Sequence, residues 1–197
     1  MLALYDRRFR DLASPLTQAQ PDLYIDVQNA ASMLFRLERR GVDVGARWNE
    51  IAEKAEARIG DCLSAFTLAH WMMALAATGR EQAAGRLLEA MHAFARKDTT
   101  VASIVGDVAL PICEAVLAHR RGEPARAVAL MRPVLDDMHR LGGSHAQQDV
   151  LEQLFLDAAI KADSPDDVRL LLARIKRHPV PPHSRVGYAE AAKAYLH

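Results

Sequence analysis

Apolar residues recur every three to four positions along most of the chain, and apolar and polar residues do not alternate as in a half-buried strand. This spacing places apolar side chains on one face of a helix and charged side chains on the other, as in helices that pack on a core. It predicts helices over residues 23–40, 44–59, 80–97, 125–141, 145–162 and 165–177, with a closing helix near 183–196.

The composition agrees with an all-α chain. Of the 197 residues, 35 are Ala and 24 are Leu, which head the scale of helix propensity, and 50% of the chain is apolar. This apolar content excludes a disordered chain, and two cysteines are too few for a disulfide scaffold. We therefore expect one helical domain over residues 1–197, with an N-terminal segment at 1–20 and a proline-rich loop at 178–185.

Three junctions between the expected helices resemble one another. Gly79 aligns with Gly122, 43 residues later, and Asp163 takes the same place after a further 41 residues. At each junction one helix ends, a short turn follows, and a second helix begins with small residues such as Ala83 and Ala127. The period exceeds the roughly 34 residues of a tetratricopeptide repeat and is close to the armadillo and HEAT range. The pattern predicts a tetratricopeptide-like right-handed solenoid of about four antiparallel helix pairs plus a closing helix.

Local signals mark helix starts. Ser144 and Gln147 form a capping-box pattern, and Pro165 suits the first position of a helix. Pro111 either kinks a helix that begins near Ser103 or lies in the first turn of a helix that begins after Asp107. The second arrangement breaks fewer hydrogen bonds and is favoured.

The charges balance, with 25 Lys and Arg against 25 Asp and Glu. Nucleic acid and anionic membranes attract proteins with a surplus of cations, so neither is expected as a partner. The longest uncharged run, Cys62–Gly79, is interrupted by polar residues and fits a buried central helix better than a membrane span. A local basic excess is either a solvated helix end or a patch for phosphate or an acidic partner, and comprises Arg174, Lys176, Arg177 and Arg185.

The two cysteines, Cys62 and Cys113, lie far apart in apolar surroundings, as core residues of a protein from a reducing compartment do. The N-terminal stretch becomes charged at Asp6 and lacks the apolar run of a secretory signal, so we expect a cytoplasmic protein. Two histidine pairs could be imagined as metal ligands, His139 with His145 and His178 with His183. Neither pair has a cysteine nearby or a fixed geometry. No metal and no cofactor are expected.

Four segments go beyond a generic helical repeat, at residues 24–38, 41–48, 69–79 and 141–150. Their most specific part is Gly-Gly-Ser-His-Ala-Gln at 142–147, which a repeat does not require. Together they resemble the tetratricopeptide repeat protein 38 family over most of the chain. The resemblance implies a helical-repeat fold and no assigned reaction. Members of that family are longer, and this chain resembles their C-terminal half.

No standard catalytic, phosphate-binding or dinucleotide-binding motif occurs. We therefore expect a non-catalytic scaffold that binds a peptide or protein partner on the concave face of the solenoid. The candidates to line this face are Asp26, Asn29, Arg36 and His70. The alternative reading is structural: a polar network that fixes the register of the helices, and a core histidine with its hydrogen bonds satisfied.

A second hypothesis concerns the start of the expected helix at 145–162. His145 follows two glycines, and Gln148 and Asp149 can share its helix face, although Gln148 stands where the resembled family usually has a basic residue. His145, Asp149 and His70 would then form one pocket in a small-ligand-binding protein or an unrecognised enzyme. The alternative is an exposed His145 beside the Ser144 cap.

The first helices carry apolar residues without an expected upstream partner, among them Leu4, Phe9 and Ile25. An uncovered end of a solenoid exposes apolar surface. We expect either self-association into a homodimer through this end or coverage by residues 1–20 folded back.

Overall fold

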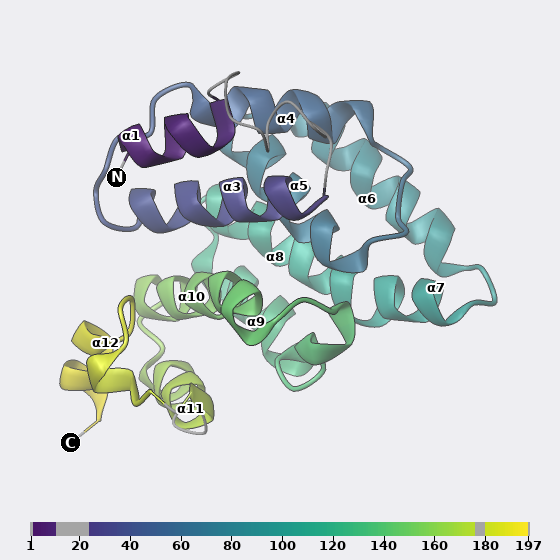
Figure 1. Cartoon of the computed structure of the whole chain (residues 1–197). Helices are drawn as coiled ribbons and strands as arrows, with labels where there is room; N and C mark the ends of the chain where they lie inside the picture. Colours follow the sequence, from purple (N-terminus) through teal and green to yellow (C-terminus); the bar gives the residue numbers. More distant parts are fainter. Residues whose placement is uncertain (1, 11–23, 176–179, 197) are drawn as a thin grey trace.

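The computed structural model describes residues 2–10, 24–175 and 180–196, and all elements in these ranges are helical. The all-α prediction is confirmed for these residues (Figure 1). Short π-helical turns lie at Asp6–Arg10 (η1) and Val105–Ala109 (η2), and 3-10 turns at Arg132–Val134 (η3), Met138–Leu141 (η4) and Pro182–Ser184 (η5). The α-helices are α1 Leu2–Tyr5, α3 Tyr24–Glu38, α4 Arg47–Ala57, α5 Ala65–Ala77, α6 Glu81–Ala95, α7 Thr100–Ile104, α8 Leu110–Arg120, α9 Pro124–Met131, α10 His145–Lys161, α11 Pro165–Ile175 and α12 Ala189–Tyr195.

The three junctions predicted to be alike share one backbone geometry. Gly79, Gly122 and Asp163 have φ of 65°, 75° and 50°, so each is in the left-handed region that ends helices. The next amide bonds back to the carbonyl five residues earlier at 2.9–3.0 Å in all three. The second helix begins two residues after the left-handed residue each time, as α6, α9 and α11. Asp163 thus takes the glycine position.

Two glycine substitutions should change stability in opposite directions. Gly122→Ala places a side chain in left-handed backbone and should lower the free energy of unfolding by about 1–2 kcal/mol. Gly85→Ala lies within α6, where an added Cβ meets nothing within 4 Å, and should raise it by about 1 kcal/mol. Urea unfolding of both variants provides the measurement, and a stabilised Gly122→Ala would contradict the shared junction geometry.

Helix α5 lies at the centre of the core, as predicted for the uncharged run. Of its 13 residues, 11 are buried, and it contacts α3, α4, α6 and α8. Both cysteines are free and buried, which confirms that they are core residues, and burial raises the pKa of the Cys113 thiol.

Pro111 lies in the first turn of α8, which begins at Leu110, so the favoured placement after Asp107 is confirmed, but α8 is not a separate helix. A continuous helical run starts at Thr100, where Thr99 caps it by accepting from the amide of Ala102. The π-helical turn η2 immediately precedes α8 and widens the backbone there. A proline lacks an N–H and crowds the carbonyl four residues earlier, so a widened turn accommodates Pro111 without ending the helix.

That run, Thr100–Arg120, is the one helix among the described residues that is long and apolar enough, by length and composition, to cross a membrane. The core helix of a soluble protein passes the same test, and 56% of its most apolar window is buried inside the protein. The run therefore carries no argument for a membrane span.

The C-terminal part differs from the sequence prediction in two places. The helix predicted over 125–141 ends at Met131 and continues as the turns η3 and η4, because Pro133 cannot donate to the helical ladder. The closing helix is shorter than expected, since α12 covers only Ala189–Tyr195 and follows the 3-10 turn η5.

Residues 2–10 pack on the first helix pair. Tyr5 is 1% exposed, and Arg47 binds the Asp6 carboxylate through two nitrogens at 2.8 and 2.6 Å. Phe9 packs partly buried against the core. Residues 2–10 thus fold back on this end, as one of the two expectations had it, but the coverage is partial, because Leu4 and Ile25 are 56% and 48% exposed. Residues 11–20 lie outside the described residues. Homodimer formation stays a prediction.

Helix α3 contacts α10 as well as α5 (Figure 1). The first and fourth helix pairs therefore meet directly, although α3 and α10 are separated by more than half of the chain. This contact positions the candidate site.

Candidate functional site

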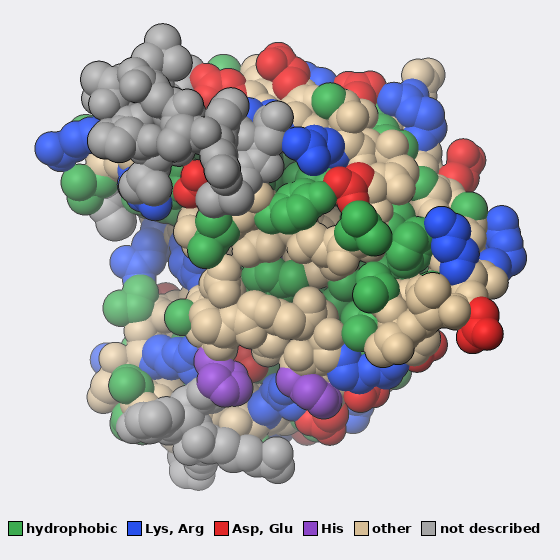
Figure 2. Space-filling view, turned by 45° about the vertical axis from the view of Figure 1, so that its right-hand side comes forward, with side chains coloured by type: hydrophobic (Ala, Val, Ile, Leu, Met, Phe, Trp, Pro, Cys, Tyr) green, Lys and Arg blue, Asp and Glu red, His purple; other side chains and the backbone are tan. Residues whose placement is uncertain are grey.

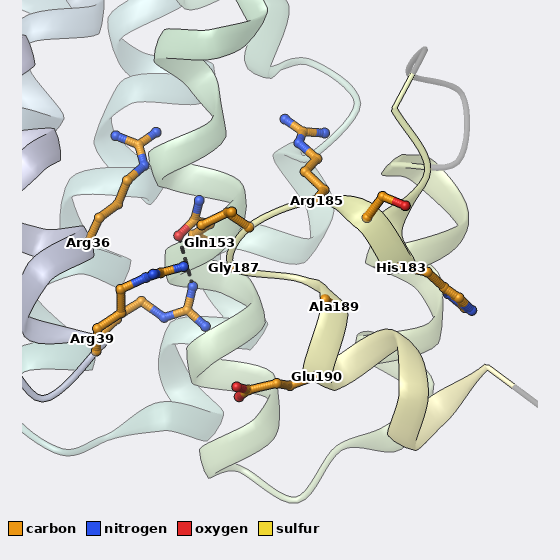
Figure 3. Close-up of a pocket in the computed structure, with 11 residues that line it drawn as sticks. Arg36, Arg39, Gln153, His183, Arg185, Gly187, Ala189 and Glu190 are labelled. Atoms are coloured by element: carbon orange, nitrogen blue, oxygen red, sulfur yellow. Dashed lines mark hydrogen bonds between the residues drawn. The ribbon is translucent and has the colours of Figure 1, made fainter.

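A cavity of about 600 Å³ lies between the end of α3 and the segment that leads into α12, with α10 beside it (Figure 3). We name it the arginine cavity, because Arg36, Arg39, Arg40 and Arg185 all line it. The left-hand edge of the molecule is indented between the parts that hold α3 and α12, and Lys or Arg side chains lie in this indentation (Figure 2).

The sequence explains why these side chains converge. Arg39 and Arg40 follow Arg36 at spacings of three and four, which places the three on one side of α3 and its end. On the opposite wall, Gly187 has φ of 93°, and a Cβ there would lie 2.8 Å from the Gln153 side chain. Glycine suits this position because other residues are strained at such a positive φ, whereas the Gln153 side chain could move aside for a Cβ.

Asp149 is the buried anchor of the site. Its carboxylate accepts hydrogen bonds from Arg36 at 2.9 Å and from Arg185 at 2.6 Å. It also accepts from the Tyr188 hydroxyl at 2.9 Å and from Gln153 at 2.6 Å. Burial and the negative charge of Asp149 raise the pKa of Tyr188, which keeps its hydroxyl a donor. One carboxylate thus fixes two cavity arginines and the C-terminal segment.

A second carboxylate, Asp157, holds Arg39. Arg39 donates to Gln153 at 3.1 Å and lies 3.5 Å from Asp157. Asp157 also contacts His119 at 2.6 Å and Lys161 at 2.7 Å. Burial raises the pKa of Asp157, but the hydrogen bonds from His119 and Lys161 outweigh this and hold it well below its usual range. It therefore stays charged and keeps Arg39 in place.

One guanidinium remains available after these pairings. The exposed Arg40 side chain forms no hydrogen bond or ion pair with any residue of the described ranges. One terminal nitrogen of Arg185 (Nη1) also lacks a hydrogen-bond partner, but it is buried and has no surface that a ligand could touch. Glu190 is the only carboxylate among the described lining residues, and His183 points away from the cavity (Figure 3). Guanidinium groups bind carboxylate and phosphate oxygens by paired hydrogen bonds. The arrangement is suited to bind an anion.

His70 does not line a groove. It has 0% exposure, its Nδ1 contacts the Phe66 carbonyl at 2.9 Å, and its Nε2 contacts Ser32 at 3.2 Å. Because a carbonyl only accepts, Nδ1 carries the proton and Nε2 accepts from the serine hydroxyl. Burial lowers the pKa of His70 to about 4, the Phe66 hydrogen bond opposes this, and the charge of Arg36 acts with burial. The histidine is neutral and satisfied, so the structural reading applies.

The pocket of His145, Asp149 and His70 is not formed. His145 is exposed, whereas His70 has no accessible surface that a shared ligand could touch. Gln148 donates to the Gly142 carbonyl at 2.9 Å, which ties α10 to the preceding turn. Ser144 and Gln147 form the predicted capping box.

The remaining predicted residues, Asp26 and Asn29, lie at two different places in the molecule. Asp26 lies 3.7 Å from Arg8, beside the N-terminal segment. Asn29 lines a second, more apolar cavity of about 310 Å³ that adjoins the arginine cavity. Of the predicted set, only Arg36 and Asp149 are joined directly.

A buried polar chain links the helices behind this site. Gln147 donates to Gln28 at 3.1 Å, and Gln28 donates to Thr67 at 2.8 Å. This chain connects α10, α3 and α5, so polar residues on these helices bind one another. It is an inter-helix polar network, but it is built from other residues than Asp26, Asn29 and Arg36, for which the sequence left such a network as an alternative.

Sequence reasoning missed Arg39, Arg40 and Tyr188. The spacing of Arg39 and Arg40 after Arg36 was an available signal, whereas nothing local marks Tyr188. Arg185 stood out only as part of a basic excess, because its partner Asp149 is 36 positions away. Arg174 likewise pairs with Asp136, outside the basic excess. Lys176 and Arg177, the other two residues of that excess, lie outside the described residues.

Comparison with protein-family models and with solved structures found no match. Within the described ranges, no group of three or more His, Cys, Asp or Glu residues is placed to hold a metal ion.

Proposed function

We propose that this chain is a helical-repeat binding module that holds an acidic segment of a protein partner in the arginine cavity. The observation that carries the proposal is the exposed Arg40 guanidinium, which has no side-chain partner among the described residues and lines one cavity together with three further arginines. An acidic side chain in the cavity would pair with Arg40. The proposed role is scaffolding without catalysis, in the cytoplasm.

The proposal includes a tetratricopeptide-like right-handed solenoid. Its support is the shared backbone of the three junctions, together with the contacts of successive pairs. The second helix of each pair contacts the first helix of the next, as α4 with α5, α6 with α8, and α9 with α10. The resemblance to the tetratricopeptide repeat protein 38 family agrees with this arrangement.

The partner is assigned to the arginine cavity and not to a concave groove. Helices α3 and α10 are in contact, and their facing polar residues, such as Gln28 and Gln147, bind each other. A peptide between these helices would have to break those hydrogen bonds. The arginine cavity is open and leaves Arg40 available.

Fluorescence anisotropy with a labelled glutamate-rich octapeptide tests the proposal. Wild type should bind it, and Arg40→Ser should weaken binding about tenfold, because a hydrogen bond to a charged group contributes about 1.5–3 kcal/mol. Arg96→Ser, an exposed arginine at the end of α6, is the matched control and should bind as wild type does. Equal binding of the glutamine version of the peptide would contradict the proposal.

A further inference from the structure

The arginine cavity continues into the second cavity of about 310 Å³. Asn29, Met33 and Leu37 line the second cavity, and the two cavities share Arg36, Arg40 and Val186. We name the part lined by Met33, Leu37 and Val186 the apolar trough. Charged and apolar binding surfaces thus meet at the same shared side chains.

The trough adds apolar surface next to the free guanidinium. Val186 is 69% exposed, and it lines both cavities. Met33, half-buried, is a flexible and polarisable side chain that adapts to varied partners. An occupant with only charged groups would leave this surface in water.

Resting on the proposed function, we infer that the partner segment carries a bulky apolar residue within about two positions of its acidic residue. Arg36, Arg40 and Val186 line both cavities, so the charged and the apolar contact adjoin each other. Neighbouring side chains of one short segment can reach both, since two residues of extended chain span about 7 Å. The acidic group is a carboxylate or a phosphate, since guanidinium groups bind both.

An extended peptide fits better than an enclosed small molecule. Ligand pockets for small molecules usually bury about 70–90% of the ligand. Here Val186 and Arg40 are both exposed, so an occupant would be covered on one side only. Such one-sided contact is typical of a peptide segment held by its side chains.

The test is an octapeptide array scanned for binding to the full chain, followed by anisotropy in solution. One set combines Glu with Leu or Phe one or two positions away, a second replaces the apolar residue by Ser, and a third replaces Glu by Gln. A fourth set carries phosphoserine instead of Glu. The acidic–apolar peptides should bind about tenfold tighter than the acidic–serine peptides. The ratio of the affinity for the phosphoserine peptides to the affinity for the Glu peptides shows whether the site prefers a phosphate or a carboxylate.

Two variants distinguish the contribution of the apolar trough to peptide binding from the contribution of the arginines. Val186→Ser should remove the advantage of the apolar residue, so that the variant binds the acidic–apolar and the acidic–serine peptides with equal affinity. Val180→Ser, an exposed valine of the same segment that lines neither cavity, is the matched control and should keep the advantage.

The outcomes distinguish the two proposals. Equal affinity for acidic–apolar and acidic–serine peptides, or an advantage that survives in Val186→Ser, overturns the inference and leaves the proposed function standing. Acidic peptides that bind wild type no better than their Gln versions overturn both.

Discussion

Acidification from pH 7.5 to pH 4 should remove about 3 kcal/mol from the free energy of unfolding through His70 alone. Burial holds the pKa of this histidine at about 4 in the folded chain, against about 6.5 for an unfolded one. The shift of about 2.5 units corresponds to about 3 kcal/mol at 1.36 kcal/mol per unit. His70 is wholly buried, so solvent does not screen this effect.

The sign follows from proton binding. Between pH 6.5 and pH 4 the unfolded chain binds a proton at His70 and the folded chain does not. Stability from the neutral, buried ring is therefore fully present above pH 6.5 and is lost as the pH falls towards 4. Protonation also removes the acceptor that Nε2 offers to Ser32.

Urea unfolding of wild type and His70→Gln at four pH values between 7.5 and 4 provides the measurement. Carboxylates titrate in both proteins, so the difference between the two curves isolates His70. The variant should be less stable at pH 7.5 and should lose about 3 kcal/mol less on acidification. His92→Gln, an exposed histidine of α6, is the control and should follow the wild-type curve. Parallel curves for wild type and His70→Gln would contradict the prediction.

Replacement of Asp149 by alanine should destabilise the chain by about 3–5 kcal/mol. The carboxylate accepts from Arg36, Arg185, Gln153 and Tyr188. Its removal takes this acceptor from Arg185 and Gln153 and leaves Arg36 and Tyr188 with backbone carbonyls only. Removing one member of a buried ion pair costs this much because the remaining charge is left uncompensated. The C-terminal segment should also detach from α10, since Asp149 bonds both Arg185 and Tyr188.

Chemical unfolding measures the first effect, and tryptic cleavage after Arg185 reports the second. Asp149→Asn keeps the shape and part of the hydrogen bonding, so it should lose less stability than Asp149→Ala. Asp136→Ala is the matched control, because Asp136 is 91% exposed and its pair with Arg174 is a surface pair worth at most about 1 kcal/mol. Equal losses for Asp149→Ala and Asp136→Ala would show that Asp149 is no anchor.

The fold class and the junctions were predictable because their causes are local. Helical spacing of apolar residues reports a face that must be buried, whatever it packs on. Left-handed backbone at Gly79 and Gly122 follows from residue type, and the alignment extended it to Asp163. The capping box at Ser144 needs only four successive residues to be recognised.

Helix boundaries near prolines were less predictable, because two physical answers compete. The helix α9 ends just before Pro133, although the apolar spacing continues beyond it. At Pro111 the helical run continues, because a π-helical turn precedes the proline. Surrounding packing decides between these outcomes, and neighbouring residues in the sequence do not reveal it.

The site depended on contacts between distant segments. Arg36 and Asp149 were each noticed separately, but their pairing requires α3 to lie against α10. Arg185 had no acidic neighbour in its own stretch and found one on another helix. For His70 the sequence allowed two positions, because a histidine in an apolar helix can line a groove or lie in the core. Its burial decides between them.

The contact of α3 with α10 has a consequence for how the chain loses its structure. In an open array of repeats each unit touches only its neighbours, and either end can melt alone. Here the Arg36–Asp149 pair spans 113 positions, and it makes the first helix pair a neighbour of the fourth. Melting of the first helix pair would remove packing from the fourth, so we expect these pairs to unfold together in one cooperative transition.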